Sequence, residues 1–373
     1  MSWTEWAAQE LRSLETIDRL RRTVAFDGDG PRGVVAGRSI ISFASNDYLG
    51  LASHPRVRAA AHAAIDRYGA GAMASRLIVG TRSLHHELEA ALARWKSCES
   101  ALVFSSGFAT NVGVLSTLGA ADVTVFSDAL NHASIIDGCR LARARTQVYR
   151  HNDVAHLAAL MGATRGRKIV ATESVFSMDG DRAPIDQLAE LCKEHAALLV
   201  LDEAHDALGD CDAHDVEILR VGTLSKTLGA LGGFVAGPKA LIDLLVNRAR
   251  TFIFTTGLSP ADAAAALAAL EIVTGEEGAR LRARLGELID LLRPGHGTAI
   301  IPVIIGAEAA ALQAAQHLLQ QGIHVPAIRP PTVAPGTSRL RIALSASHTP
   351  SMVQRLREAL DSLPLCESAA SFA

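Results

Sequence analysis

The spacing of apolar residues divides the chain into two regions with different patterns. In the first region short apolar runs alternate with longer stretches in which apolar residues recur at helical spacing. The runs that we predict to be strands are Ala101–Phe104, Val123–Phe126, Gln147–Tyr149, Lys168–Glu173, Leu198–Asp202, Ile218–Thr223 and Gly233–Ala236. The predicted helices between them include Ile135–Arg143, Val154–Met161 and Ile185–His195. Strands that alternate with helices predict an α/β fold with a mostly parallel central sheet covered on both faces.

The second region, after Phe254, has a different order of elements. The pattern predicts helices over residues 260–273, 278–292 and 308–321, strands at Ala299–Ile305, near Val325 and at Leu340–Ala343, and a last helix from Pro350. At the other end of the chain, residues 5–25 have the pattern of an amphipathic helix, and a turn-rich stretch follows at Asp27–Gly37. We therefore expect three parts: a helical arm (residues 1–40), a large domain (41–257) and a smaller C-terminal α+β domain (258–373).

Composition narrows the class of protein without indicating its chemistry. The 373 residues are 49% hydrophobic and 20% charged, and the net charge of −3 does not favour binding to nucleic acid or to an anionic membrane. The alanine-rich runs are too short to cross a bilayer, and the N-terminal stretch carries acids and no apolar signal core. The five cysteines are odd in number and lack CxxC spacing, so reduced thiols and a cytoplasmic location are expected.

Three motifs invite interpretations that their surroundings do not support. Gly69–Ala74 has the dinucleotide-binding glycine pattern, but a helical segment, Val57–Arg67, precedes it instead of a strand. Asp202–His205 spells a helicase box, but the chain contains no Gly-Lys pair for a phosphate-binding loop. His85–Glu89 resembles metal ligands, but adjacent histidines point in different directions on a helix. We expect a solvated helix face there and no metal site.

Polar residues gather where the predicted strands end. The clusters are Ser105-Ser106-Gly107, Glu173 to Ser177, Asp202 to His205, and Thr223 to Lys226. In parallel sheets, ligands bind beyond the carboxyl ends of the strands. These clusters therefore predict a binding site at that edge of the sheet.

The residues in these clusters are those that pyridoxal phosphate (PLP) requires. A lone lysine is usually a solvated charge, but Lys226 lies among hydroxyl-bearing residues at a strand end, where a neutral amine could form a Schiff base. Asp202 ends an apolar strand, where a carboxylate needs a cation such as a protonated pyridine nitrogen, and His205 follows three residues later. Ser106-Gly107-Phe108 opens a helix, whose free N–H groups can bind a phosphate.

Longer motifs resemble the α-oxoamine synthase family of fold type I PLP enzymes, which join an amino acid to an acyl thioester with loss of CO₂. The resemblance extends from Ser42–Gly50 to Ser345–Thr349 and includes Asn131–Ser134 and Val175–Asp181. It implies a PLP-dependent acyltransferase in which Lys226 removes the Cα proton. It also implies that His132 stacks on the cofactor ring and can polarise the thioester, that Asp202 binds the pyridinium, and that His205 binds the ring hydroxyl.

Further cofactor contacts are implied by the same resemblance. They are Gly107, Phe108, Ser177, Thr223 and Ser225 in the same chain, and Thr255 and Thr256, which would reach the phosphate of a second subunit. The last pair implies a homodimer.

Two other segments resemble the family member that joins L-alanine to a pimeloyl thioester, carried by CoA or by an acyl carrier protein. They are His151–Val154 and Ile328–Thr337. The substrate contacts that this implies are Arg21, Asn46, Arg329, Thr332 and Arg341, with Arg341 on the amino-acid carboxylate. For Arg339 and Arg341 the alternative is surface charge on a strand.

Two alternatives for the function stay open. One is a related synthase that uses glycine or serine with another thioester, and the other is a non-catalytic PLP-binding paralogue. The second is motivated by segments shorter than the family's, after His205 (Asp206–His214) and at Leu291–Thr298. The sequence does not determine how these two shortened segments change the geometry of their loops or the control of substrate entry.

Overall fold

The computed structural model describes residues 1–209 and 216–363. Within them the chain forms two compact units. The large unit contains residues 49–177 and 181–282, and the small unit contains residues 1–48, 178–180 and the segment that begins at residue 283.

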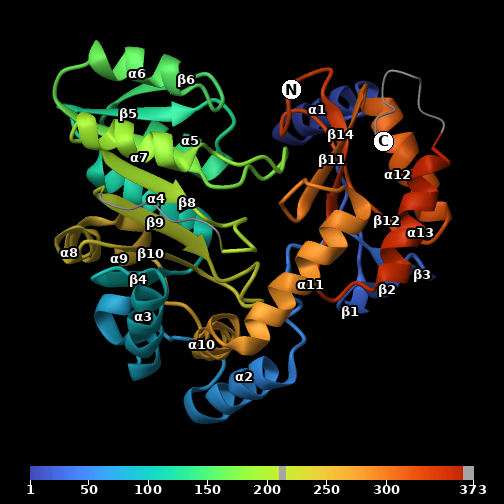
Figure 1. Ribbon diagram of the computed structural model, residues 1–373, viewed down its shortest axis with the longest axis horizontal. Coiled ribbons are helices and arrows are strands. Elements are labelled where there is room, and N and C mark those ends of the chain that lie inside the picture. The colour runs from blue at the N-terminus through green and yellow to red at the C-terminus, as the bar shows by residue number, and fades with distance from the viewer. Residues whose placement is uncertain (210–215, 364–373) are drawn as a thin grey trace. The chain divides into compact units, whose positions relative to one another are not determined.

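A seven-stranded sheet forms the centre of the large unit, in the order β4-β10-β9-β8-β7-β5-β6 (Figure 1). Its strands are β4 (Ser100–Phe104), β5 (Val123–Asp128), β6 (Arg145–Tyr149), β7 (Arg167–Glu173), β8 (Leu198–Asp202), β9 (Ile218–Thr223) and β10 (Gly233–Gly237). The strands from β9 to β6 pair in parallel, and β10 is antiparallel to both of its neighbours. The predicted mostly parallel sheet is therefore confirmed, and each predicted strand lies within two residues of an observed one.

Both faces of this sheet are buried because successive side chains of a strand point to opposite sides. Along β5, Val125 packs into a cluster with α4, α5, α8 and α9, whereas the next residue, Phe126, packs into a second cluster with α6 and α7. These helices are α4 (Gly107–Leu118), α5 (Ala133–Leu141), α6 (Val154–Gly162), α7 (Ile185–Glu194), α8 (Lys239–Arg248) and α9 (Arg250–Ile253). Two buried faces explain why the strands are continuous apolar runs.

Further helices complete the large unit. They are α2 (Pro55–Tyr68), α3 (Ser83–Trp95) and α10 (Pro260–Thr274), with a short π-helical segment, η1 (Arg76–Gly80). The alanine-rich α10 packs against α2 and α3, since small side chains allow close approach. The helix α11 (Glu276–Leu292) continues from residue 282 of the large unit into residue 283 of the small unit.

The small unit contains two sheets. One has the order β1-β2-β3-β12 and the other β11-β14-β13. Their strands are β1 (Asp27–Asp29), β2 (Arg32–Val35), β3 (Arg38–Ser42), β11 (Ile300–Gly306), β12 (Ile323–His324), β13 (Ala327–Ile328) and β14 (Ser338–Ala343). Its helices are α1 (Trp3–Thr16), α12 (Glu308–Gln320) and α13 (Pro350–Asp361).

This division differs from the predicted domain boundaries at residues 40 and 257. Residues before 49 group with the C-terminal segment because β3 pairs in parallel with β12, with Ile41 opposite Ile323. Residues 258–282 group with the large unit, because α10 packs on α2 and α3. None of the helices among residues 1–209 and 216–363 combines the length and the apolar content that a bilayer crossing requires.

Candidate active site

A buried carboxylate lies at the carboxyl end of β8. Asp202 is 6% exposed, and its Oδ2 accepts a hydrogen bond from Asn111 Nδ2 at 2.6 Å. Its Oδ1 accepts one from the backbone N–H of Ala204 at 2.9 Å. Both donors are neutral, and among the described residues no ion pair involves Asp202. A charge buried in this way is costly until a cation reaches it.

An amine and an imidazole lie in the same cavity as Asp202. Lys226 follows β9 in the chain, and its Nζ lies 2.9 Å from Nε2 of His205, which is itself buried. A neutral Nε2 can accept a hydrogen bond from the amine, which fixes where Nζ points. The sheet brings these residues together because β8 and β9 are parallel neighbours and end at the same edge.

The third part of the site is the N-terminus of α4. Ser106 caps this helix by accepting a hydrogen bond from the N–H of Ala109 at 3.1 Å, which leaves the N–H groups of Gly107 and Phe108 without intrahelical partners. A Cβ at Gly107 would lie 3.4 Å from Cβ of Thr223. The helix N-terminus and the end of β9 therefore line one cavity, and the helix dipole favours an anion there.

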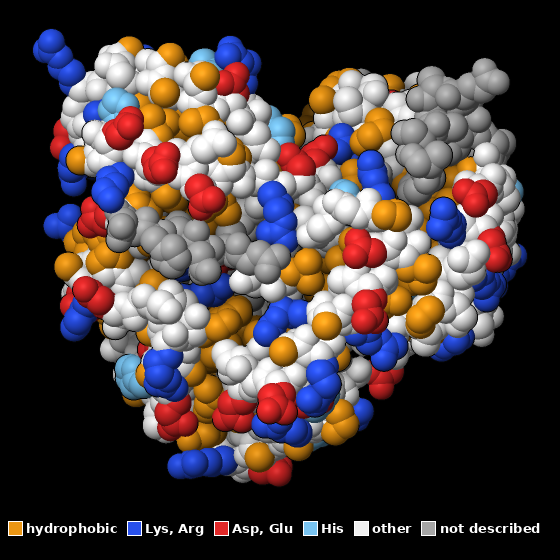
Figure 2. Space-filling view, in the orientation of Figure 1, with side chains coloured by type: hydrophobic (Ala, Val, Ile, Leu, Met, Phe, Trp, Pro, Cys, Tyr) orange, Lys and Arg blue, Asp and Glu red, His pale blue; other side chains and the backbone are white. Residues whose placement is uncertain are grey.

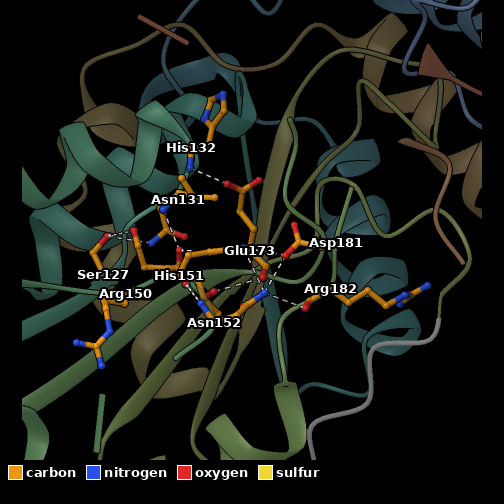
Figure 3. Close-up of polar contacts among 12 residues, drawn as sticks. Ser127, Asn131, His132, Arg150, His151, Asn152, Glu173, Asp181 and Arg182 are labelled. Atoms are coloured by element: carbon orange, nitrogen blue, oxygen red, sulfur yellow. Dashed lines mark hydrogen bonds and ion pairs between the residues drawn. The ribbon is translucent and has the colours of Figure 1, made fainter. Parts of the chain in front are cut away.

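His132 and Glu173 are joined by a backbone contact on another side of this cavity. Glu173 Oε1 accepts a hydrogen bond from the N–H of His132 at 2.6 Å (Figure 3). Burial, followed by the nearby charge of Asp202, raises the pKa of Glu173 to about 8. Partial burial lowers the pKa of His132, and Lys226 adds to this while Asp202 opposes it. The His132 ring is thus neutral near pH 7, and it remains partly exposed in the cavity.

The cavity has a volume of about 240 Å³ and gathers most of the predicted cofactor contacts. The predicted residues that line it are Gly107, Phe108, His132, Asp202, His205, Thr223, Ser225 and Lys226. Three others do not line it. Ser177 lies in the loop after β7, where its N–H binds Glu173, and Thr255 and Thr256 lie after α9 in the chain.

Asn111 and Glu173 line the cavity, and the sequence analysis assigns neither of them a contact with cofactor or substrate, although Glu173 belongs to a polar cluster predicted at this edge. A signal for Asn111 was available, because it lies one helical turn after Gly107 and therefore on the same face of the helix. Glu173 ends its strand just as Asp202 ends the next one, and the register pairs the two.

The predicted substrate contacts belong to the small unit, where they form two groups. Arg341 is 5% exposed and donates from Nη1 to Asn46 Oδ1 at 3.2 Å. Arg21 donates to the carbonyl oxygens of Arg329 and Pro330, at 3.3 and 3.1 Å. Thr332 is exposed and lies in the turn that begins at Arg329. The alternative interpretation, that Arg339 and Arg341 are surface charges on a strand, is therefore wrong. Arg341 is buried, and Arg339 is buried in an ion pair with Asp179.

The expectation of a solvated face at His85–Glu89 is wrong for three of its residues, one of which is the fully buried Leu88. His85 is fully buried, and its Nε2 lies 2.9 Å from the carbonyl oxygen of Leu258. Glu89 is buried against Arg76 at 2.9 Å. No group of potential metal ligands occurs in the described part of the chain. Of the shortened segment after His205, residues 210–214 lie outside the described residues.

A larger cavity, of about 780 Å³, lies elsewhere in the large unit. Its lining includes Leu141, Arg143, Arg250 and Phe254. Its lining lacks the combination of amine, imidazole and buried carboxylate, so the smaller cavity is the candidate active site. On the face in Figure 2, Lys and Arg side chains lie among Asp and Glu, which matches the small net charge.

Comparisons with known proteins found similar sequences along nearly the whole chain. A family model described as aminotransferase class I and II matches residues 38–360. An 8-amino-7-oxononanoate synthase from Anaeromyxobacter dehalogenans is 49% identical, with 95% of this chain and 94% of the relative covered.

Two solved structures extend the similarity to the fold. A serine palmitoyltransferase from S. paucimobilis with bound PLP–myriocin has a TM-score of 0.90 at 29% identity, with 96% of each chain covered. An 8-amino-7-oxononanoate synthase from Francisella tularensis has a TM-score of 0.72 at 28% identity, with 86% of this chain and 96% of that chain covered.

Proposed function

Since the chain belongs to the aminotransferase class I and II family and, within it, to the 8-amino-7-oxononanoate synthases, we propose that it condenses L-alanine with a pimeloyl thioester. The products are 8-amino-7-oxononanoate, CO₂ and a free thiol, as required in biotin biosynthesis. The enzyme is an acyltransferase and its cofactor is PLP.

The observation that supports PLP in this cavity is the pairing of Asp202 with neutral donors. A carboxylate buried beside Lys226, with Asn111 and Ala204 as its hydrogen-bond donors, needs a cation, and a protonated pyridine nitrogen supplies one. The N-terminus of α4 and Thr223 suit a phosphate, and Lys226 Nζ suits an aldehyde. When bound, PLP activates the amino acid through its aldehyde and accepts electron density from Cα into its ring.

Each residue of the cavity then has a defined task. With PLP and alanine bound, Lys226 Nζ would take the Cα proton, and His205 Nε2, 2.9 Å away, would orient that amine. Asp202 keeps the pyridine nitrogen protonated, because its carboxylate favours the cation. His132, which is neutral and partly exposed, would stack on the cofactor ring and donate a hydrogen bond to the thioester carbonyl. Ser177 and Ser225 add cofactor contacts.

The small unit supplies the proposed substrate contacts. Arg341 binds the alanine carboxylate as a bidentate pair, and Asn46, which accepts from the same guanidinium, orients it. Arg21, Arg329 and Thr332 bind the distal carboxylate of the pimeloyl chain, which needs a cationic or hydrogen-bonding partner when it loses water.

We further propose a cytoplasmic homodimer. Three consecutive large apolar residues of η1, Leu77, Ile78 and Val79, are 50%, 74% and 55% exposed, and Phe254 is 70% exposed. Helix η1 and the segment that contains Phe254 lie side by side, because α9 packs against η1 and the N–H of Gly257 donates to the carbonyl oxygen of Ala74. An apolar surface of this kind is typical of an interface. A second copy covering it would bring Thr255 and Thr256 to the phosphate of its partner.

Product analysis tests the proposed reaction. The purified holoenzyme is incubated with L-alanine, glycine or L-serine, each with pimeloyl-CoA, pimeloyl-carrier protein, acetyl-CoA or succinyl-CoA, and products are identified by mass spectrometry. We expect 8-amino-7-oxononanoate from alanine and a pimeloyl thioester, with one CO₂ and one thiol per product. A preference for another pair would assign the protein to a related synthase, and PLP binding without any product would indicate a non-catalytic paralogue.

A further inference from the structure

His151, which follows β6, lies between two carboxylates of other segments. Its Nδ1 is 2.9 Å from Asp128 Oδ1. Its Nε2 is 2.7 Å from Asp181 Oδ2 (Figure 3). A carboxylate oxygen only accepts hydrogen bonds, so both ring nitrogens must donate. A ring that donates from both nitrogens is an imidazolium. The geometry therefore assigns a positive charge to His151.

The surroundings of His151 stabilise this charge. Burial alone would lower the pKa of His151, but hydrogen bonds to Asp128 and Asp181 raise it to about 10. The ring also meets the Phe176 ring edge to face, with 4.4 Å between centroids. Of the neighbouring arginines, Arg150 pairs with Asp153, and both Arg150 and Arg182 extend away from the cluster (Figure 3). The charges that face the ring are therefore the two carboxylates.

The first carboxylate shapes the turn that leads to His132. Asp128 ends β5 and is fully buried. It accepts hydrogen bonds from the N–H groups of Leu130, at 2.8 Å, and Asn152, at 2.9 Å. These bonds set the path of the backbone from Asp128 to His132.

The second carboxylate belongs to the segment that leads away from Glu173. Asp181 accepts a hydrogen bond from Asn152 Nδ2 at 2.9 Å, and its carbonyl oxygen accepts one from the N–H of Phe176 at 3.0 Å. The two segments meet again at the cavity, where the N–H of His132 donates to Glu173. His151 therefore ties together, from outside the cavity, the backbone segments that carry His132 and Glu173.

We propose that His151 is a positioning residue. Its ring donates hydrogen bonds to Asp128 and Asp181 and so holds together the two segments that contain these carboxylates. His132 thereby keeps its position relative to the cofactor and the thioester. His151 itself touches neither substrate nor cofactor, since it does not line the cavity. This inference rests on the proposed function for the part that His132 plays.

A double-mutant cycle tests whether His151 acts through His132. In the holoenzyme, His151→Gln keeps one donor but loses the charge, and should lower kcat about tenfold, the effect of losing one charge-assisted hydrogen bond. The KM for alanine should change less than about threefold, because Arg341 is untouched. In a His132→Ala background the same substitution should lower kcat by less than about twofold more.

His156→Gln is the matched control. The His156 ring accepts a hydrogen bond from the N–H of Arg150 at 3.0 Å, and among the described residues no carboxylate contacts this ring, so its variant should keep wild-type kcat. If His151→Gln does not fold, Asp181→Asn removes one carboxylate at a position that is 42% exposed and should give the same non-additive pattern at smaller size. Wild-type kcat in His151→Gln, or losses that multiply in the double variant, would overturn the proposal.

A second measurement does not depend on activity. Nitrogen-15 spectra of the cofactor-free wild-type protein at pH 8 should show both ring nitrogens of His151 protonated, and a neutral ring would overturn the proposal. If the wild type makes no 8-amino-7-oxononanoate, the proposed function fails, whereas this spectrum still decides the state of His151.

Discussion

Buried carboxylates of the large unit differ in their partners, and the difference singles out Asp202. Glu89 pairs with Arg76 at 2.9 Å, and Glu203 pairs with Lys96 at 2.6 Å and with Arg220. Asp202, which precedes Glu203 in the chain, has neutral donors instead. Breaking a buried ion pair by removing one partner is strongly destabilising, so Glu89 and Glu203 serve the fold. Glu173, the other buried carboxyl group of the cavity, also has neutral donors, but its pKa is raised to about 8, which favours its uncharged form at pH 7. Asp202 therefore offers a buried negative charge that a cationic ligand can neutralise.

Two arginines of the small unit should separate the two substrates kinetically. Arg341→Gln should raise the KM for alanine with little effect on the thioester, and Arg21→Gln should do the reverse. Loss of one charge-assisted contact costs about 1.5–3 kcal/mol, or roughly tenfold to a hundredfold in affinity. Steady-state kinetics measures both values. Arg22→Gln is the control, since Arg22 is exposed and its ion pair with Glu15 is long, at 3.9 Å. If both variants weakened alanine alone, the pimeloyl carboxylate would bind elsewhere.

The charge of His151 also makes stability depend on pH. Its pKa in the folded protein, about 10, exceeds the ordinary value of 6.5. The folded state therefore binds the proton more tightly, and the resulting stabilisation is complete below pH 6.5 and disappears as pH rises through 10. Urea unfolding of wild type and His151→Gln should show a difference in unfolding free energy that is largest near pH 6 and shrinks towards pH 10. A difference that grows over that range would contradict the assigned charge.

The sequence predicts individual site residues best where a strand end fixes their position. Lys226, Asp202 and His205 follow apolar strands, so the sheet itself brings them together. Asn111 lies inside a helix, where its spacing from Gly107 indicates the face that it shares but not its partner, Asp202, at 2.6 Å. The partners of His151 are 23 and 30 residues away, and such contacts leave no local pattern.

At the scale of elements, periodicity identifies what is buried and misses what is exposed. The sheet of the large unit was predicted because its strands are buried on both faces. The pattern predicts turns where the strands β1 and β2 lie, because these strands are short, glycine-containing and mostly exposed. Helix α1 was predicted to reach residue 25 but ends at Thr16, where Asp18 adopts a φ of 56° and the chain leaves the helix. The apolar spacing continues past that point, so the pattern alone overestimates the helix.

One close contact between elements should control cofactor affinity. A Cβ at Gly233 in β10 would lie 2.5 Å from the backbone nitrogen of Gly107 at the start of α4. Gly233→Ala should displace this helix N-terminus and weaken PLP binding roughly tenfold or more, since phosphate contacts are charge-assisted. Equilibrium titration of the cofactor-free protein with PLP measures this. Gly162→Ala, at a position with open space around it, should bind like wild type. Equal affinity in Gly233→Ala would mean that the phosphate lies elsewhere.

At the scale of the whole molecule, the division into units was the least predictable feature. Sequence order suggested that the C-terminal domain begins after residue 257, but the small unit combines residues 1–48 with the segment that begins at residue 283. This grouping depends on the pairing of β3 with β12, in which Ile41 lies opposite Ile323. Most of the chain lies between these two strands. A pairing between two short strands so far apart has no local signature in the sequence.

Hybrid dimers test whether two chains share each site. Lys226→Ala and Thr256→Ala chains are mixed after unfolding and refolded together, and activity is assayed at limiting PLP. Half of the dimers should be hybrids, each with one intact site, so activity should recover to about a quarter of wild type. Each variant refolded alone is the control. An active monomer at assay concentration, or no recovery in a confirmed hybrid, would contradict the shared site.

The central claim is that Lys226 holds the cofactor, and the small number of lysines makes it directly testable. The chain has five: Lys96, Lys168, Lys193, Lys226 and Lys239. Borohydride reduction of the holoenzyme fixes PLP to the amine that carries it, and trypsin does not cut after a modified lysine. The label should therefore appear on a peptide running from Val221 to Lys239, and Lys226→Ala should yield none. A label on any of the other four lysines, or an unlabelled but active wild type, would contradict the account.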